Sequence, residues 1–205
     1  YVTNPILYEN SILQGFEKFY GSIRNYNILA LIPERKHSSL AFMINFLSQQ
    51  SGKSRSGFYY SRPEALADIL KGMESSGEKT ILIGLSHALL DFFRLFPIPL
   101  QKVIVMETGG MKGSRRELTR DQLHRELKEI TGLPCIHSEY GMTELLSQAW
   151  STGNGMFRCP PWMKITVRSI TDPLSYVKSG ASGGINCIDL ANVNSCAFIA
   201  TGDAG

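Results

Sequence analysis

The stretch KTILIGLSHALLDFFRLFPIPLQKVIVM, residues 79–106, decides the fold class. It opens with a short apolar run at 79–83 and closes with another at 102–106, and both are typical of strands buried on both faces. The segment between them, 86–96, is long enough for a helix and carries mostly apolar residues. Because a tight turn cannot join parallel strands, two strands linked by a helix predict a parallel pair.

The same alternation extends along the chain in both directions. Apolar spacing and capping residues predict further helices at 5–20, 38–50, 64–75, 119–131 and 143–150, and further strands at 27–32, 57–60 and 134–138. The helix that begins at Thr119 has a capping box, since Gln122 follows three residues later. The sequence therefore predicts an α/β fold, with a parallel sheet covered by helices on both faces.

Beyond Trp150 the pattern changes. Strands are predicted at 163–167, 184–189 and 197–201, separated by turns rich in Gly, Pro, Ser and Asn. We expect an α/β subdomain at 1–150, followed by a β-rich subdomain at 151–205.

Composition excludes several classes of protein. The net charge is +3, and the Lys and Arg residues are scattered, so we expect no nucleic-acid partner. No apolar run is long enough to span a membrane. The four cysteines form no CxxC pair and suggest no disulfide framework, so we expect a cytoplasmic location.

Two loops follow predicted strands, at the sheet edge where ligands bind in this class of fold. The first is Met106-Glu107-Thr108-Gly109-Gly110-Met111-Lys112-Gly113. Its glycines let backbone N–H groups approach a flat or anionic ligand closely. Without further support, such a loop is more often a plain turn.

The second loop is Ser138-Glu139-Tyr140-Gly141-Met142-Thr143-Glu144. Tyr140 can lie against a purine, and Gly141 permits a sharp turn. Thr143 can donate to a phosphate oxygen, while Glu144 can hold Mg²⁺. In the alternative reading, Thr143 caps a helix at 143–150 and Glu144 complements its dipole.

Three segments resemble motifs of the adenylate-forming superfamily, which includes acyl-CoA synthetases, luciferases and peptide-synthetase adenylation domains. Tyr140-Gly141-Met142-Thr143-Glu144 is similar to its Tyr-Gly-x-Thr-Glu motif, and Thr201-Gly202-Asp203-Ala204-Gly205 is similar to its Thr-Gly-Asp-x-Gly motif. Thr108-Gly109-Gly110 sits where the glycine loop of that superfamily packs on adenine. The order and the spacing, about thirty and then about sixty residues, also agree. The wider sequence most resembles the acyl-protein synthetase family (the LuxE type), close to the phenylacetate-CoA ligases.

This resemblance implies a site. Gly109 and Gly110 would border the adenine, with Tyr140 stacked on it and Gly141 beside it. Asp203 would bind the ribose hydroxyls. Thr143 and Glu144 would be the catalytic residues, Thr143 at the α-phosphate and Glu144 holding Mg²⁺. The cofactors implied are therefore ATP or AMP and Mg²⁺, with coenzyme A as a further candidate.

The implied reaction activates a fatty or aromatic carboxylic acid to acyl-AMP with release of pyrophosphate. The acyl group then passes to a thiol, either an enzyme cysteine or coenzyme A, and an acyl-accepting or acyl-donating protein is a further expected partner. The superfamily's phosphate loop is expected before Tyr1, and its catalytic lysine in a domain after Gly205. Without them, we expect this chain alone to be inactive.

Other readings stay open. Gly84-Leu85-Ser86-His87-Ala88 has the position of a hydrolase nucleophile elbow, but Ala88 stands where that motif needs glycine. Ser86 and His87 are expected either to line the carboxylate pocket or to serve as a helix cap and its neighbour. Cys135, His137 and Cys159 lack the spacing and fourth ligand of a zinc site. The competing functions are a non-catalytic nucleotide- or acyl-binding module and an acyltransferase with a Ser or Cys nucleophile.

Overall fold

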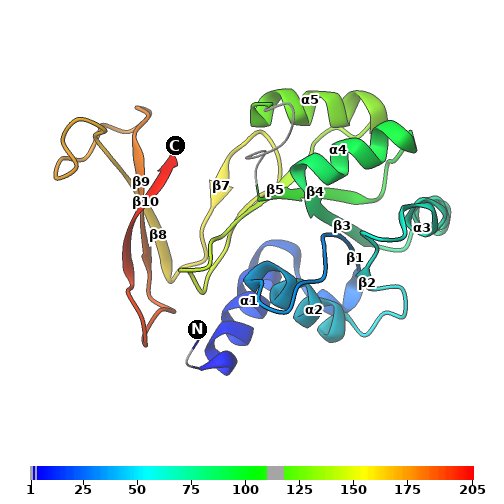
Figure 1. Ribbon diagram of the computed structural model, residues 1–205, viewed down its shortest axis with the longest axis horizontal. Helices are drawn as coiled ribbons and strands as arrows, with labels where there is room; N and C mark the ends of the chain where they lie inside the picture. The colour runs from blue at the N-terminus through cyan, green and yellow to red at the C-terminus, as the bar shows by residue number, and fades with distance from the viewer. Residues whose placement is uncertain (1, 3, 110–117) are drawn as a thin grey trace.

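The computed structural model describes residue 2, residues 4–109 and residues 118–205. These residues form two sheets and the helices that cover the larger one (Figure 1). In chain order the elements are α1 (Pro5–Tyr20), a 3-10 helix (Ile23–Asn25), β1 (Asn27–Leu31), α2 (Ser39–Ser51), β2 (Gly57–Phe58), α3 (Pro63–Ser76), β3 (Thr80–Leu85), α4 (Ser86–Leu95), β4 (Ile104–Thr108), α5 (Arg120–Thr131), β5 (His137–Tyr140), β6 (Ala149–Ser151), β7 (Phe157–Arg158), β8 (Met163–Arg168), β9 (Gly184–Asp189) and β10 (Phe198–Ala204).

The large sheet has the order β2-β1-β3-β4-β5-β6-β7. The first five strands in this order, β2, β1, β3, β4 and β5, are parallel to one another. Strands β6 and β7 extend the sheet in antiparallel fashion. The stretch 79–106 supplies β3, α4 and β4, and β3 pairs with β4 from Ile81↔Ile104 to Leu85↔Thr108. The predicted α/β class is confirmed.

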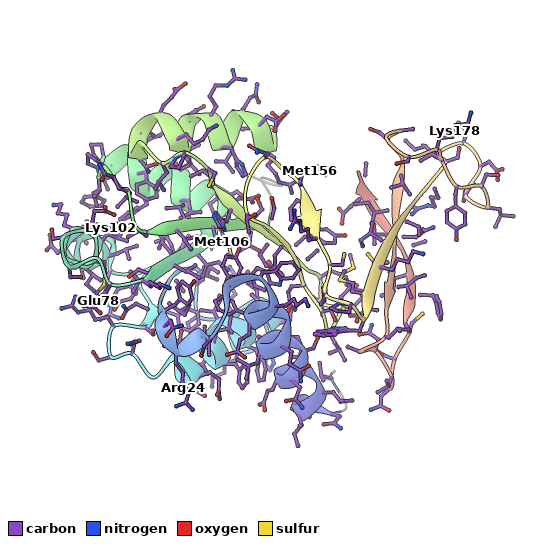
Figure 2. All side chains as sticks on the ribbon, turned by 180° about the vertical axis from the view of Figure 1, so that it is seen from behind. Arg24, Glu78, Lys102, Met106, Met156 and Lys178 are labelled. Atoms are coloured by element: carbon purple, nitrogen blue, oxygen red, sulfur yellow. The ribbon has the colours of Figure 1, made fainter. Side chains whose placement is uncertain are left out.

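Successive side chains of the central strands point to opposite faces of the sheet. On β1, Leu29 and Leu31 join the core beneath α3, α4 and α5, whereas Ile28 and Ala30 join the core beneath α1 and α2. Figure 1 shows these two groups of helices on opposite sides of the sheet. In Figure 2, Met106 of β4 lies in the interior, while the charged residues labelled there lie at the periphery. The central strands are almost wholly apolar because both of their faces are covered.

The helix starting at Thr119 has the predicted capping box. The Thr119 hydroxyl accepts a hydrogen bond from the Gln122 backbone, and the Gln122 side chain accepts one from the Thr119 backbone. At the other end, Gly132 has a φ of 75°, a left-handed conformation that favours glycine. Helix α5 is therefore defined by local signals at both ends.

Strands β4 and β5 begin two or three residues later than predicted and end two residues later. The predicted helix at 143–150 is wrong. Residues 143–144 form a turn, residues 146–147 form a bend, and β6 then pairs antiparallel with β5. The same geometry removes the alternative in which Thr143 caps a helix.

The reason for this loop lies in the second sheet. Asp189 at the end of β9 is fully buried, and its carboxylate accepts hydrogen bonds from the backbone N–H groups of Leu146 and Ser147 at 3.0 and 2.8 Å. It also accepts one from the Ser147 hydroxyl at 2.7 Å. Asn192 accepts a second bond from the Leu146 N–H and donates to the Glu144 carbonyl. Bonds from distant residues thus replace the intrahelical bonds that the local pattern suggested.

The small sheet has the order β10-β9-β8 and is antiparallel throughout, and its three strands lie where strands were predicted. It lies beside β7, and its hairpin loop carries Lys178 at the far end of the molecule (Figures 1 and 2). The chain passes from one sheet to the other between Arg158 and Met163. The subdomain boundary at residue 150 stays a prediction. Among the described helices, none combines the length and the apolar character needed to cross a membrane.

Replacing Asp189 by Ala should lower the free energy of unfolding by roughly 2–4 kcal/mol, because it leaves several buried donors without an acceptor. Urea unfolding measures this. Asp91→Ala, which removes an exposed carboxylate from α4, should change stability by about 0.5 kcal/mol or less. Equal stability of the two variants would contradict the role given to Asp189.

Candidate functional site

Most of the predicted site residues lie at one edge of the large sheet, and Asp203 lies on β10 of the small sheet. Ser86 follows β3, Gly109 follows β4 and Gly141 follows β5. These strands are parallel neighbours, so their carboxyl ends meet at the same edge. Gly109 is exposed and has a φ of 79°, which favours glycine at the strand end. Gly110, the other glycine assigned to adenine, lies outside the described residues.

Tyr140 and Asp203 are brought together from separate sheets. The Tyr140 hydroxyl donates to Asp203 Oδ2 at 2.9 Å. Burial, followed by the nearby Asp203 carboxylate, raises the pKa of Tyr140 above its ordinary value, so the phenol stays protonated. On the β10 side, the Asp203 N–H donates to the Thr201 hydroxyl at 3.1 Å. The two motifs of the resemblance therefore meet in space although about sixty residues separate them in the sequence.

Thr143 and Glu144 form an exposed turn directly after Gly141. Among the described residues, no group of three or more His, Cys, Asp or Glu side chains could hold a metal ion. The Glu144 carboxylate is exposed to solvent. Such a group suits Mg²⁺, which commonly takes one or two protein carboxylates, water and phosphate oxygens rather than a complete protein cage.

A cavity of about 250 Å³ opens beside this turn. The N-terminal part of α2 contributes apolar groups, Leu40 and Met43 among them. The loop between β5 and β6 contributes Gly141, Thr143 and Gln148. The ends of β4 and β5 complete the wall, with Thr108, Gly109 and Glu139. The cavity therefore combines residues of the glycine loop with residues of the Tyr-Gly-Met-Thr-Glu loop.

Ser86 and His87 are not among the residues that line this cavity in the described part of the chain. Ser86 is buried and donates to Glu107 Oε2 at 2.8 Å, while His87 is half-buried beside it. Their assignment to a carboxylate pocket stays a prediction. Cys135, His137 and Cys159 do not form a metal-binding group. The His137 ring instead forms a hydrogen bond with the Tyr20 hydroxyl, with 3.1 Å between Nδ1 and the phenol oxygen.

Glu107 is a buried carboxylate that was not predicted from the sequence as a site residue. Its Oε1 lies 3.0 Å from Arg120 Nε and 3.6 Å from His124 Nε2. Burial alone would raise the pKa of Glu107, but hydrogen bonds from His124, Ser138 and Ser86 and the charge of Arg120 lower it to about 2. Glu107 is therefore ionised at neutral pH.

Glu139 is a second buried carboxylate, on the neighbouring strand. The Thr108 hydroxyl donates to its Oε2. Burial raises the pKa of Glu139 to about 7, and the charge of Glu107 adds to this rise. A Cβ placed on Gly141 would lie 2.6 Å from Glu139 Oε1, so a larger residue at position 141 would require the Glu139 side chain to shift.

The sequence contained a signal for Glu107. It lies on a strand whose other residues are buried or half-buried, and an ionisable residue in such a strand is rare unless it is paired or functional. The signal for Glu139 was weaker, because Ser138 is the one other buried residue of its strand. Gln148 and Asp189 had no such signal, because polar residues in loops and at strand ends are common.

No family model and no curated protein matches this sequence. Solved structures do match. The chain is similar to an ATP-bound RpMatB-BxBclM chimera (14% identity, TM-score 0.69), to the long-chain-fatty-acid-CoA ligase FadD1 from Archaeoglobus fulgidus (16%, 0.67) and to McyG A-PCP complexed with phenylalanyl-adenylate (14%, 0.66). Each match covers 97% of this chain. The chain in turn spans 41%, 45% and 36% of those structures, less than half of each.

These neighbours are adenylate-forming enzymes, and the match shows that the chain has the fold of part of such an enzyme. At this level of identity the likeness concerns the fold. The likeness of the fold agrees with the resemblance seen in the motifs. A special closeness to the LuxE type or to the phenylacetate-CoA ligases stays a prediction.

The raised pKa of Glu139 predicts a pH-dependent stability. Its folded pKa of about 7 exceeds the ordinary value of 4.5, so the folded chain holds this proton more tightly than the unfolded chain. The free energy of unfolding should therefore fall as pH rises from about 4.5 to about 7, by about 3 kcal/mol from this group. Urea unfolding across this range should show that Glu139→Gln removes the fall. Exposed Glu129→Gln should leave it unchanged, and a wild-type profile that rises by the same amount would contradict the assignment.

Proposed function

We propose that this chain is part of an enzyme that activates a carboxylic acid with ATP, forming acyl-AMP and pyrophosphate, and passes the acyl group to a thiol. One observation carries the proposal. Segments far apart in the sequence converge at the carboxyl edge of a parallel sheet, where Tyr140 contacts Asp203 and the neighbouring Gly109, Gly141 and Thr143 line one cavity. The fold of the structural neighbours supports it.

In this proposal the nucleotide binds across the Tyr140–Asp203 contact. The aromatic ring of Tyr140 packs against adenine, and the carboxylate of Asp203 accepts hydrogen bonds from the ribose hydroxyls. Gly109 and Gly110 border the adenine, and Gly141 leaves room beside it. The Tyr140 phenol remains protonated, so it can hold the Asp203 carboxylate in position as a donor.

Thr143 and Glu144 act at the phosphates. The Thr143 hydroxyl donates to the α-phosphate, and Glu144 would hold Mg²⁺, which neutralises the charge on the leaving pyrophosphate. Thr143 also lines the cavity, so a carboxylate held there lies next to the α-phosphorus. An oxygen of that carboxylate attacks phosphorus, and the bond to pyrophosphate breaks. Orientation of the two reactants supplies much of the rate.

In the second step of the proposed reaction, a thiolate attacks the mixed anhydride of acyl-AMP, and AMP leaves. The question is which thiol acts as this acceptor. Cys187 is fully buried, and burial raises the pKa of its thiol to about 11. Few thiolates form at such a site, so Cys187 is poorly suited as an acceptor. Coenzyme A, another cysteine of the enzyme or an acyl-carrying partner protein is the better candidate. All four cysteines of this chain are unpaired, which supports a reducing compartment such as the cytoplasm.

The alternative of a serine acyltransferase is disfavoured by Ser86. Its hydroxyl is buried and donates to Glu107, whose pKa is lowered to about 2. Such a carboxylate is a very weak base and does not activate a nucleophile at neutral pH. The alternative of a non-catalytic nucleotide- or acyl-binding module keeps the same contacts, and only a measurement of turnover separates it from the ligase.

Carboxylate-dependent ATP–pyrophosphate exchange tests the proposal. It should be measured on the full-length protein with Mg²⁺, across short, aromatic and long-chain acids. We expect exchange with one class of acid. Glu144→Ala and Asp203→Ala should each reduce it by about 10²-fold or more, because they remove contacts to the metal and to the ribose.

Glu129→Ala, which removes an exposed carboxylate from α5, serves as the matched control and should keep wild-type exchange. If folded protein binds ATP but shows no exchange with any acid, the ligase proposal is contradicted and the non-catalytic binding module is supported. Exchange that survives both Glu144→Ala and Asp203→Ala would show that the site is assigned to the wrong residues.

A further inference from the structure

The wall of the cavity contains a buried acceptor without a partner. Gln148 is 4% exposed and lines the cavity, and its Oε1 has no hydrogen-bond partner among the described residues. Leaving such a group unpaired destabilises the folded state. Native proteins rarely keep this cost without a reason, and a ligand that donates a hydrogen bond removes it.

A second acceptor lies in the same wall. One oxygen of Glu139 is bound by the Thr108 hydroxyl. The other, Oε1, lies against Gly141, and Gln148 packs close to the same glycine. A Cβ added at Gly141 would meet Glu139 Oε1 at 2.6 Å and Gln148 Cγ at 3.5 Å. Glu139 and Gln148 are therefore neighbours around this glycine, and both line the cavity.

The remaining wall limits the size of the ligand. The cavity, at about 250 Å³, is smaller than most sites for drug-sized ligands, and Leu40 and Met43 give it an apolar side. Tyr8 also lines it, but its hydroxyl already donates to the Ser39 carbonyl at 3.2 Å. A short ligand with one apolar side and one donor group matches these features.

We propose that the cavity binds the acyl part of a short carboxylic acid that bears a hydrogen-bond donor, a hydroxyl or an ammonium group, received by Gln148 Oε1 and the Glu139 carboxylate. This rests on the proposed function, since Thr143 at the rim of the cavity is the residue assigned to the α-phosphate. A fatty chain, which the sequence resemblance favours, would cover both acceptors with apolar atoms and leave them unpaired. The lining of the cavity therefore opposes a fatty acid.

The test compares acids of equal size on the full-length protein. Three probes differ at carbon 3 alone: 3-hydroxybutyrate, 3-aminobutyrate and 3-methylbutyrate. The corresponding set at carbon 2 is lactate, alanine and isobutyrate. Acetoacetate is a further control, because its carbonyl at carbon 3 can accept a hydrogen bond but cannot donate one. For each, ATP–pyrophosphate exchange gives the rate, and isothermal titration calorimetry without ATP gives the affinity.

We expect a hydroxyl or ammonium acid to exceed its methyl isostere by about tenfold or more in both measurements. Gln148→Met, which has a similar shape but lacks the acceptor, should reduce this preference to about threefold or less. Gln50→Met, on the exposed end of α2, should retain it. Glu139→Gln removes the negative charge, so it should weaken an ammonium acid more than a hydroxyl acid and thereby tells the two apart.

The outcomes separate this proposal from the proposed function. Binding of a donor acid with the expected preference, but without exchange, supports the cavity assignment and contradicts adenylation. Exchange with the methyl isosteres, acetoacetate or a long-chain acid at least equal to that with the donor acids overturns the cavity assignment and leaves adenylation standing. A preference that persists in Gln148→Met would also overturn it.

Discussion

Asp189 is fully buried, and its two oxygens accept hydrogen bonds from the Leu146 and Ser147 N–H groups and from the Ser147 hydroxyl. A charge at this depth is stable only where donors surround it. The chain between β5 and β6 consequently forms a loop and not a helix, and Thr143 and Gln148 of this loop both line the cavity. In a helix these two residues, five positions apart, would point to different sides. The cavity thus depends on a carboxylate from the other sheet.

The two buried carboxylates at the sheet edge behave differently although they lie on neighbouring strands. Glu107 is surrounded by donors and by Arg120, which keeps its pKa near 2. Glu139 receives the Thr108 hydroxyl, and its burial together with the charge of Glu107 raises its pKa to about 7. Neighbouring carboxyl groups with pKa values driven apart are frequent at functional sites. Here the ionised one maintains the structure beneath the site, and the one that titrates near neutral pH faces the cavity.

Sequence patterns predicted the elements whose signals are local. The alternation in 79–106 gives β3, α4 and β4, and the Thr119–Gln122 capping box marks the start of α5. The helix at 143–150 was predicted wrongly because the decisive partners, Asp189 and Asn192, lie more than forty residues away from the loop that they bind. Gln148 could not be identified for the same reason. By contrast, Tyr140 and Asp203 were identified by motif resemblance, and the structure places them in contact.

Both proposals require a nucleotide bound across the Tyr140–Asp203 contact with the acyl group in the adjoining cavity. A crystal structure of the full-length protein with a non-hydrolysable acyl-adenylate analogue would reveal this arrangement. We expect adenine against the Tyr140 ring, the ribose hydroxyls at Asp203 and the acyl group beside Gln148 and Glu139. An analogue bound elsewhere, or one whose ribose lies away from Asp203, would contradict it.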